Sequence, residues 1–99
     1  MTTLSAANRS HRRAGLEVIL LKQTLVLPWS QFLYAEGGDD QIRLVFSTHD
    51  IVVSGNRLGP LLADVSAQRV SRLREPTRTE KFTHYAGPQI SRILVRKLD

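Results

Sequence analysis

The chain has 99 residues, 41% of them hydrophobic, and a formal net charge of +5. This length and composition predict one small globular domain rather than a chain that is disordered throughout. The absence of cysteine excludes disulfides, zinc–thiolate sites, iron–sulfur clusters and thiol nucleophiles, and it removes the usual sign of a small secreted domain.

The basic charge is concentrated at the two ends of the chain. Residues 1–15 carry three arginines and no acidic residue, whereas residues 16–66 carry three basic and six acidic residues. Residues 67–99 carry eight basic and three acidic residues. A partner that recognises positive charge would therefore meet the N-terminal segment or the last third of the chain.

Residues 1–15 predict a disordered basic arm, because small and polar residues without periodicity bury too little surface to offset the entropy of ordering. We expect a single domain over residues 16–97. No apolar run approaches the roughly 20 residues of a membrane-spanning helix, and the run after the arginines is shorter than that of a signal peptide. We therefore expect a cytoplasmic protein.

Residues 16–27, LEVILLKQTLVL, favour β-structure, either as two short strands broken near Lys22 or as one longer strand. Pro28 ends the pairing, because it has no N–H to donate. Residues 29–34 fit both a helical spacing and a strand alternation. We expect a short helical turn that leads into a strand near residues 32–36.

Residues 37–40, GGDD, form a strong turn signal. Ile42, Leu44 and Phe46 then alternate with other residues, as in a half-buried strand, and residues 51–53 are apolar enough for a central strand. Together with the preceding strand, these segments predict an antiparallel meander over residues 32–54.

An amphipathic helix is predicted at about residues 57–68. Asn56 is a suitable N-cap, and Pro60 is tolerated only in the first turn, which places the start between Asn56 and Gly59. The spacing of the apolar residues is i, i+3, i+4, i+7, which predicts a stripe that packs across the sheet: Leu58, Leu61, Leu62 and Val65.

Val70 and Leu73 indicate either the end of this helix or an edge strand. Residues 76–89 read as a long loop, which Phe82 and Tyr85 would pin to the body of the domain. Residues 90–97 predict a last strand with Ile93 and Val95 on its buried face.

The expected fold class is α+β, with a small antiparallel sheet of five or six strands in a meander and one main helix. The predicted core comprises Val18, Leu20, Leu25, Leu27, Phe32, Ile42, Leu44, Phe46, Ile51, Val53, Leu58, Leu61, Leu62, Val65, Ile93 and Val95.

A basic surface in the last third is the first candidate site. It would neutralise the phosphates of a nucleic acid, with Phe82 and Tyr85 available for base stacking. The alternative is a solvated face whose arginine stems cover a small core, because Glu75 and Glu80 interrupt the basic run. The candidate nucleic-acid-binding residues are Arg69, Arg72, Arg74, Arg92 and Arg96.

Trp29 is the candidate interface residue. It follows a proline near an expected sheet edge, where an exposed tryptophan would support binding to a protein partner or self-association. The alternative is that the indole belongs to the core.

No reaction chemistry is predicted. His49 and the other histidines lack a nucleophile at a suitable spacing, and neither a G-x-S-x-G, an H-E-x-x-H nor a phosphate-binding loop motif is present. The acidic residues Glu36, Asp39, Asp40 and Asp50 lack the spacing of a calcium-binding loop. We therefore expect no enzymatic activity, no metal and no cofactor.

Three segments resemble a class of short uncharacterised bacterial α+β proteins. They are an L-P-[WY] bend at residues 27–29, an F-x-x-H-x-[IV]-x-V-x-G-x-x-L hairpin at residues 46–58 and an I-x-R-I-x-V strand at residues 90–95. The element order over residues 34–65 is also similar to that of LytTR DNA-binding domains. Those domains continue with an aromatic–arginine–histidine strand and an asparagine, which residues 70–75 lack.

The bacterial class has no established activity, so this resemblance implies a fold and not a function. We expect a small non-catalytic cytoplasmic accessory or protein-interaction domain. The alternative is a nucleic-acid-binding protein that uses a basic C-terminal surface. The sequence therefore leaves the partner open among a nucleic acid, another protein and a second copy of the chain.

Overall fold

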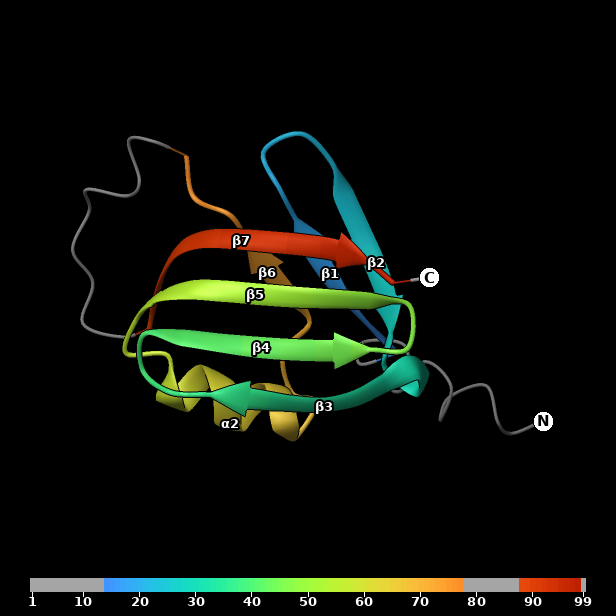
Figure 1. The fold of residues 1–99 in the computed structure, drawn as a ribbon, viewed down its shortest axis with the longest axis horizontal. Helices are drawn as coiled ribbons and strands as arrows, with labels where there is room; N and C mark the ends of the chain where they lie inside the picture. Colours follow the sequence, from blue (N-terminus) through green and yellow to red (C-terminus); the bar gives the residue numbers. More distant parts are fainter. Residues whose placement is uncertain (1–13, 78–87, 99) are drawn as a thin grey trace, which may run out of the picture.

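The computed structural model describes residues 14–77 and 88–98, which form an α+β fold with one α-helix in that part of the chain (Figure 1). The strands make two sheets, one of three strands in the order β2-β1-β6 and one of four in the order β3-β4-β5-β7. The predicted α+β class is therefore confirmed. The prediction of one sheet with five or six strands is wrong, because β1, β2 and β6 form a separate layer.

The three-stranded sheet begins with a hairpin. β1 (Gly15–Ile19) and β2 (Thr24–Pro28) pair antiparallel, so residues 16–27 form two strands rather than one. β6 (Arg72–Arg74) pairs parallel with β1 on its other side. The alternative of an edge strand near Leu73 is thus confirmed, and segments more than 50 residues apart in the sequence become neighbours.

Pro28 ends the first layer, and a 3-10 helix carries the chain to the second. This helix, η1 (Trp29–Gln31), leads directly into β3 (Phe32–Gly37), so the expected helical turn and strand follow one another. The backbone N–H of Trp29 donates to the carbonyl oxygen of Ala14 at 2.9 Å, and this bond connects the junction to the start of β1.

The four-stranded sheet contains the predicted meander. β3, β4 (Gln41–Phe46) and β5 (His49–Asn56) pair antiparallel in turn, and β7 (Gln89–Lys97) adds antiparallel to β5. Gly37 ends β3 with φ of 142°, a conformation that favours glycine, and an added Cβ would collide with the backbone of Gln41. The β3–β4 turn therefore depends on this glycine.

The helix α2 (Gly59–Ser66) is shorter than predicted, and its cap is different. It has Pro60 in its first turn, as expected, but Asn56 ends β5 and makes no cap. The free N–H of Gly59 is instead bound at 3.0 Å by Oδ1 of Asp39 from the β3–β4 turn. The prediction of an Asn56 cap is wrong, because β5 extends through that residue.

Substitution of Asp39 by alanine is expected to reduce the free energy of unfolding by about 1 kcal/mol, since it removes the acceptor for a helix-terminal N–H. Asp39→Asn keeps an acceptor and is the matched control. Urea unfolding of both variants provides the measurement. A loss as large in the asparagine variant as in the alanine variant would contradict the capping role.

The core lies between the two sheets and under α2. The inner face of the four-stranded sheet contributes Ile42, Leu44 and Phe46, among others. Three residues outside the predicted core also belong to the buried cluster: Leu16, Trp29 and Leu73. Leu20, Leu25, Phe32, Leu61, Leu62 and Val95 are only partly buried and pack against it.

Some predictions concern residues that the structure does not describe. The basic arm lies outside the described residues except for Ala14 and Gly15, and so do Phe82 and Tyr85 of the expected loop. Within the described ranges, the structure contains no helix that is both long and apolar enough to cross a membrane.

Candidate interaction surface

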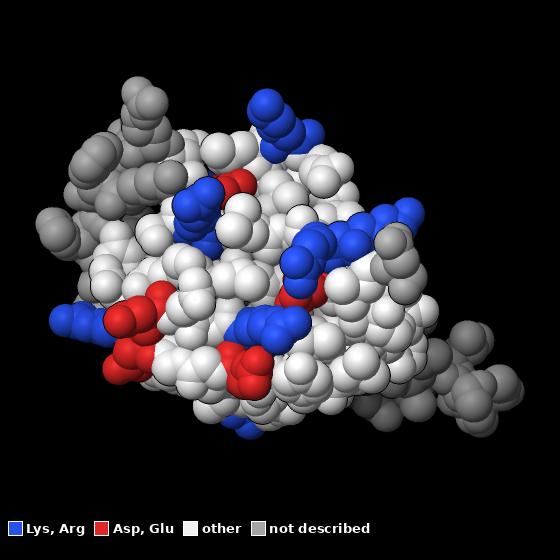
Figure 2. Space-filling view, in the orientation of Figure 1, with Lys and Arg blue, Asp and Glu red and all other residues white. Residues whose placement is uncertain are grey.

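The described elements leave the outer face of the four-stranded sheet uncovered (Figures 1 and 2). Strand side chains alternate between the two faces, so the residues between the core positions point away from the core. The register places them in rows across the sheet. The outer face comprises Tyr34, Glu36, Gln41, Arg43, Val45, Asp50, Val52, Ser54, Arg92, Leu94 and Arg96.

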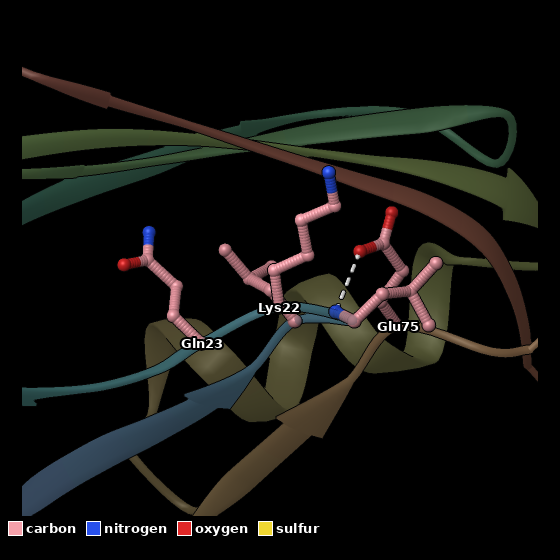
Figure 3. Close-up of a pocket in the computed structure, with 5 residues that line it drawn as sticks. Lys22, Gln23 and Glu75 are labelled. Carbon is pink, nitrogen blue, oxygen red and sulfur yellow. Dashed lines mark hydrogen bonds between the residues drawn. The ribbon is translucent and has the colours of Figure 1, made fainter.

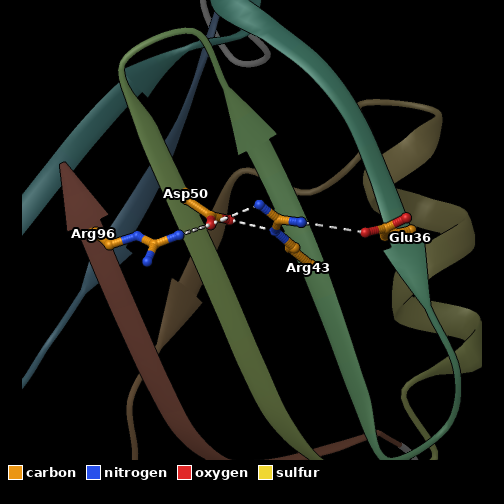
Figure 4. Close-up of polar contacts among 4 residues, drawn as sticks. All are labelled: Glu36, Arg43, Asp50 and Arg96. Atoms are coloured by element: carbon orange, nitrogen blue, oxygen red, sulfur yellow. Dashed lines mark hydrogen bonds and ion pairs between the residues drawn. The ribbon is translucent and has the colours of Figure 1, made fainter. Parts of the chain in front are cut away.

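A polar network crosses this face from one edge strand to the other (Figure 4). Arg43 on β4 donates from Nε and Nη2 to the two carboxylate oxygens of Asp50 on β5, at 2.8 and 3.0 Å. Arg96 on β7 donates to Oδ2 of Asp50 at 3.2 Å. Glu36 on β3 lies 3.5 Å from Nη1 of Arg43.

Asp50 is the centre of this network and is only 4% exposed. The two hydrogen bonds from Arg43, and then the one from Arg96, hold the pKa of the Asp50 carboxyl below its usual range, although burial opposes the shift. The same carboxylate raises the pKa of Arg43. The aspartate is therefore ionised at neutral pH and holds both guanidinium groups in place.

Apolar and aromatic side chains flank the network. Tyr34 is 46% exposed beside Val45, which lies opposite it on β4. Leu94 is 52% exposed beside the half-buried Val52 of β5. Tyrosine and arginine are residue types enriched at protein-binding sites, and Leu94 adds exposed apolar area to the same face.

The structure divides the five predicted nucleic-acid-binding arginines between different surfaces. Arg92 and Arg96 belong to the outer face of the four-stranded sheet. Arg72 and Arg74 flank buried Leu73 on β6, so they lie on the outer face of the three-stranded sheet, on the other side of the core. Arg69 follows α2.

Several of these arginines also have acidic partners. Arg69 contacts Asp64 at 3.0 Å, Arg72 contacts Glu17 at 2.9 Å, and Arg96 contacts Asp50. The outer face of the four-stranded sheet has three arginines and two acidic residues, a net charge of +1. These positions do not bring the five arginines together as one phosphate-binding stripe.

Trp29 lies in the core rather than on the surface. Its indole is 5% exposed and packs edge-on against Phe32, with a ring-centroid distance of 5.1 Å, and obliquely against Phe46 at 5.7 Å. Trp29 is therefore a core residue, which is the alternative that the sequence left open. A partner surface has to use other residues.

A shallow pocket lies beside the β1–β2 turn (Figure 3). Its walls are Leu20, Leu21, Lys22 and Gln23 from the turn and Glu75, which follows β6. Oε1 of Glu75 accepts a hydrogen bond from the Leu21 N–H at 3.2 Å. The described lining offers the ammonium of Lys22 and the carboxylate of Glu75 as its charged groups.

The acidic residues considered as metal ligands have separate roles. Asp39 caps α2, Asp50 binds two arginines, and Glu36 faces Arg43. Among the described residues, no group of three or more histidine, cysteine, aspartate and glutamate side chains is arranged to hold a metal ion.

Sequence reasoning missed most of the outer face. Arg43 and Asp50 lie seven residues apart on either side of a turn, and only their positions on the same face of paired strands bring them into contact. The residues Ser47-Thr48-His49-Asp50 favour a turn by their type, but β5 begins at His49, so Asp50 lies within a strand. The alternation of Arg92, Leu94 and Arg96 against Ile93 and Val95 did signal one edge of this surface.

No family model, curated protein or solved structure matches this chain.

Proposed function

We propose that this chain is a small non-catalytic protein-interaction domain that binds its partner through the outer face of the four-stranded sheet. The observation that carries the proposal is the combination of exposed Tyr34 and Leu94 with the ordered Arg43–Asp50–Arg96 network on one uncovered face. A network that is already hydrogen-bonded loses less on desolvation than isolated charges, so a protein partner can cover it.

An accessory role in the bacterial cytoplasm fits the cysteine-free composition and the resemblance of the chain to short bacterial α+β proteins. Nucleic-acid binding receives less support. The candidate arginines lie on different surfaces, three of them contact carboxylates, and the outer face has a net charge of only +1.

A paired surface substitution tests the proposed binding face. We expect Tyr34→Ser with Leu94→Ser to remove the partner proteins that quantitative affinity purification recovers from the native cell, because these substitutions delete the exposed apolar contacts. Val26→Ser with Leu21→Ser is the matched control, since Val26 is 67% exposed and both residues lie on the three-stranded layer. Thermal unfolding checks that both variants fold.

A partner set that the outer-face variant retains, or that the control variant loses equally, would contradict the proposal. A purified partner then allows calorimetric titration, in which we expect at least about tenfold weaker binding for the outer-face variant.

The nucleic-acid alternative has its own test. We expect no gel retardation of DNA or RNA by the full chain at about 50 mM salt, where phosphate contacts are strong. Retardation that Arg92→Ala and Arg96→Ala weaken would favour the alternative and would make the outer face a nucleic-acid surface.

A further inference from the structure

The outer face of the four-stranded sheet is charged differently along its two edges. Its β3 edge carries Glu36, whereas its β7 edge carries Arg92 and Arg96. In Figure 2, which has the orientation of Figure 1, acidic groups lie along the β3 side and near the middle of the face, and basic groups extend over β7. The Arg92 side chain makes no hydrogen bond or ion pair with the other described residues.

The charge distribution of this face allows two copies of the chain to pair with opposite charges in contact. A two-fold axis that runs above the face and parallel to the strands reverses the strand order and keeps the position along each strand. It therefore sets β3 of one copy over β7 of the other, as two sheets stacked about 10 Å apart. In such an isologous interface every favourable residue pair occurs twice.

The register of the sheet identifies the residues that would meet. Tyr34 and Arg96 belong to one row across the sheet, so the ring of one copy would face the guanidinium of the other. Glu36 and Leu94 belong to the next row. The carboxylate of Glu36 would thus approach Leu94 of the second copy, within reach of the long Arg92 side chain two residues away.

We propose that the occupant of this face is a second copy of the chain, and that the domain forms a two-fold symmetric dimer in which Glu36 of each copy lies over Leu94 of the other, within reach of the Arg92 side chain. The proposal rests on the proposed function, because it assigns a partner to the same face. The face covers about 400 Å² in projection, given strand spacings near 4.8 Å. That is small for a permanent interface, so the dimer is expected to depend on concentration.

Sedimentation velocity of the full chain tests the dimer. Between about 1 μM and about 1 mM we expect the weight-average mass to rise from that of one chain toward that of two. A mass that stays at one chain over the whole range would overturn the dimer. The partner-loss experiment with Tyr34→Ser and Leu94→Ser would then still decide the proposed function independently.

Charge reversal tests the orientation of the two copies. Glu36→Arg and Arg92→Glu each introduce two like-charge contacts per dimer, so each variant alone is expected to self-associate at least about tenfold more weakly than the wild type. An equimolar mixture of the two variants is expected to associate again, because in the mixed dimer the two introduced charges attract each other in one contact and the native Glu36–Arg92 pair forms the other.

Recovery on mixing separates recognition between copies from a structural defect, since a misfolded variant would not regain association from a second misfolded variant. Glu17→Arg, on the outer face of the three-stranded sheet, is the control and is expected to leave the dimer unchanged. Wild-type association without an effect of either reversal, or a mixture that fails to associate, would overturn the proposal.

Discussion

Trp29→Ala is expected to reduce the free energy of unfolding by about 3–5 kcal/mol, the range for truncating a buried aromatic side chain. The indole is enclosed by Phe32 and Phe46 where η1 connects the two layers, so its loss leaves a cavity at the junction of both sheets. The total free energy of unfolding of a small domain is about 5–15 kcal/mol, so the variant would be only marginally stable.

Urea unfolding followed by far-UV circular dichroism provides the measurement, because Trp29 is the only tryptophan and its fluorescence disappears in the variant. Trp29→Phe is the informative comparison. It keeps an aromatic ring against Phe46 and removes Nε1, which is buried and has no hydrogen-bond partner among the described residues. We expect Trp29→Phe to reduce the free energy of unfolding by less than half as much as Trp29→Ala does.

Leu33→Ala is the surface control for this experiment. Leu33 is exposed on β3, four residues from Trp29, and its truncation is expected to change stability by less than about 0.5 kcal/mol. A Trp29→Ala variant as stable as Leu33→Ala would contradict the assignment of the indole to the core.

Asp50→Asn is expected to have the second largest effect, a loss of about 1–2 kcal/mol. The substitution keeps the shape of the side chain but leaves Arg43 and Arg96 without the carboxylate that both bind. Loss of one partner from a fully buried ion pair costs more than this, but both guanidinium groups are partly exposed and regain water. Glu36→Gln, which changes only an exposed pair at 3.5 Å, is expected to have a much smaller effect.

The stabilising contribution of Asp50 is expected to depend on pH. Its folded-state pKa is lowered, so the contribution is present above the unfolded-state pKa near 3.9 and is lost as the pH falls through the folded-state value. The difference in unfolding free energy between wild type and Asp50→Asn should therefore be constant near pH 7 and shrink below about pH 4. A difference that grows on acidification would contradict the ion-pair assignment.

Local sequence patterns predicted individual elements well. The alternation at Ile42, Leu44 and Phe46 and the glycines of the preceding turn located the meander, because strand periodicity and turn chemistry act over a few residues. Pro60 placed the helix start correctly for the same reason. The cap was not predictable, since Asp39 reaches Gly59 from a turn 20 residues earlier.

The candidate surface was only partly predictable. The alternation in β7 indicated that Arg92, Leu94 and Arg96 share one face, and the structure supports that reading. Nothing local indicated that Asp50 lies within a strand or that Arg43 contacts it, because both facts depend on the register between β4 and β5. The sequence also does not show that Arg72 and Arg74 lie on a different sheet from Arg92 and Arg96. It therefore predicted one basic stripe that contains all four arginines.

The sequence by itself determined the meander strands, the last strand, the helix and the class of the fold, because each depends on periodicity, proline, glycine and turn residues within a short window. Only the tertiary structure decided that the strands divide into two sheets, since the parallel pairing of β1 with β6 joins segments more than 50 residues apart. That division sets the two groups of arginines on different outer faces. It also leaves one four-stranded face, with Tyr34, Asp50 and Leu94, as the surface from which a function is proposed.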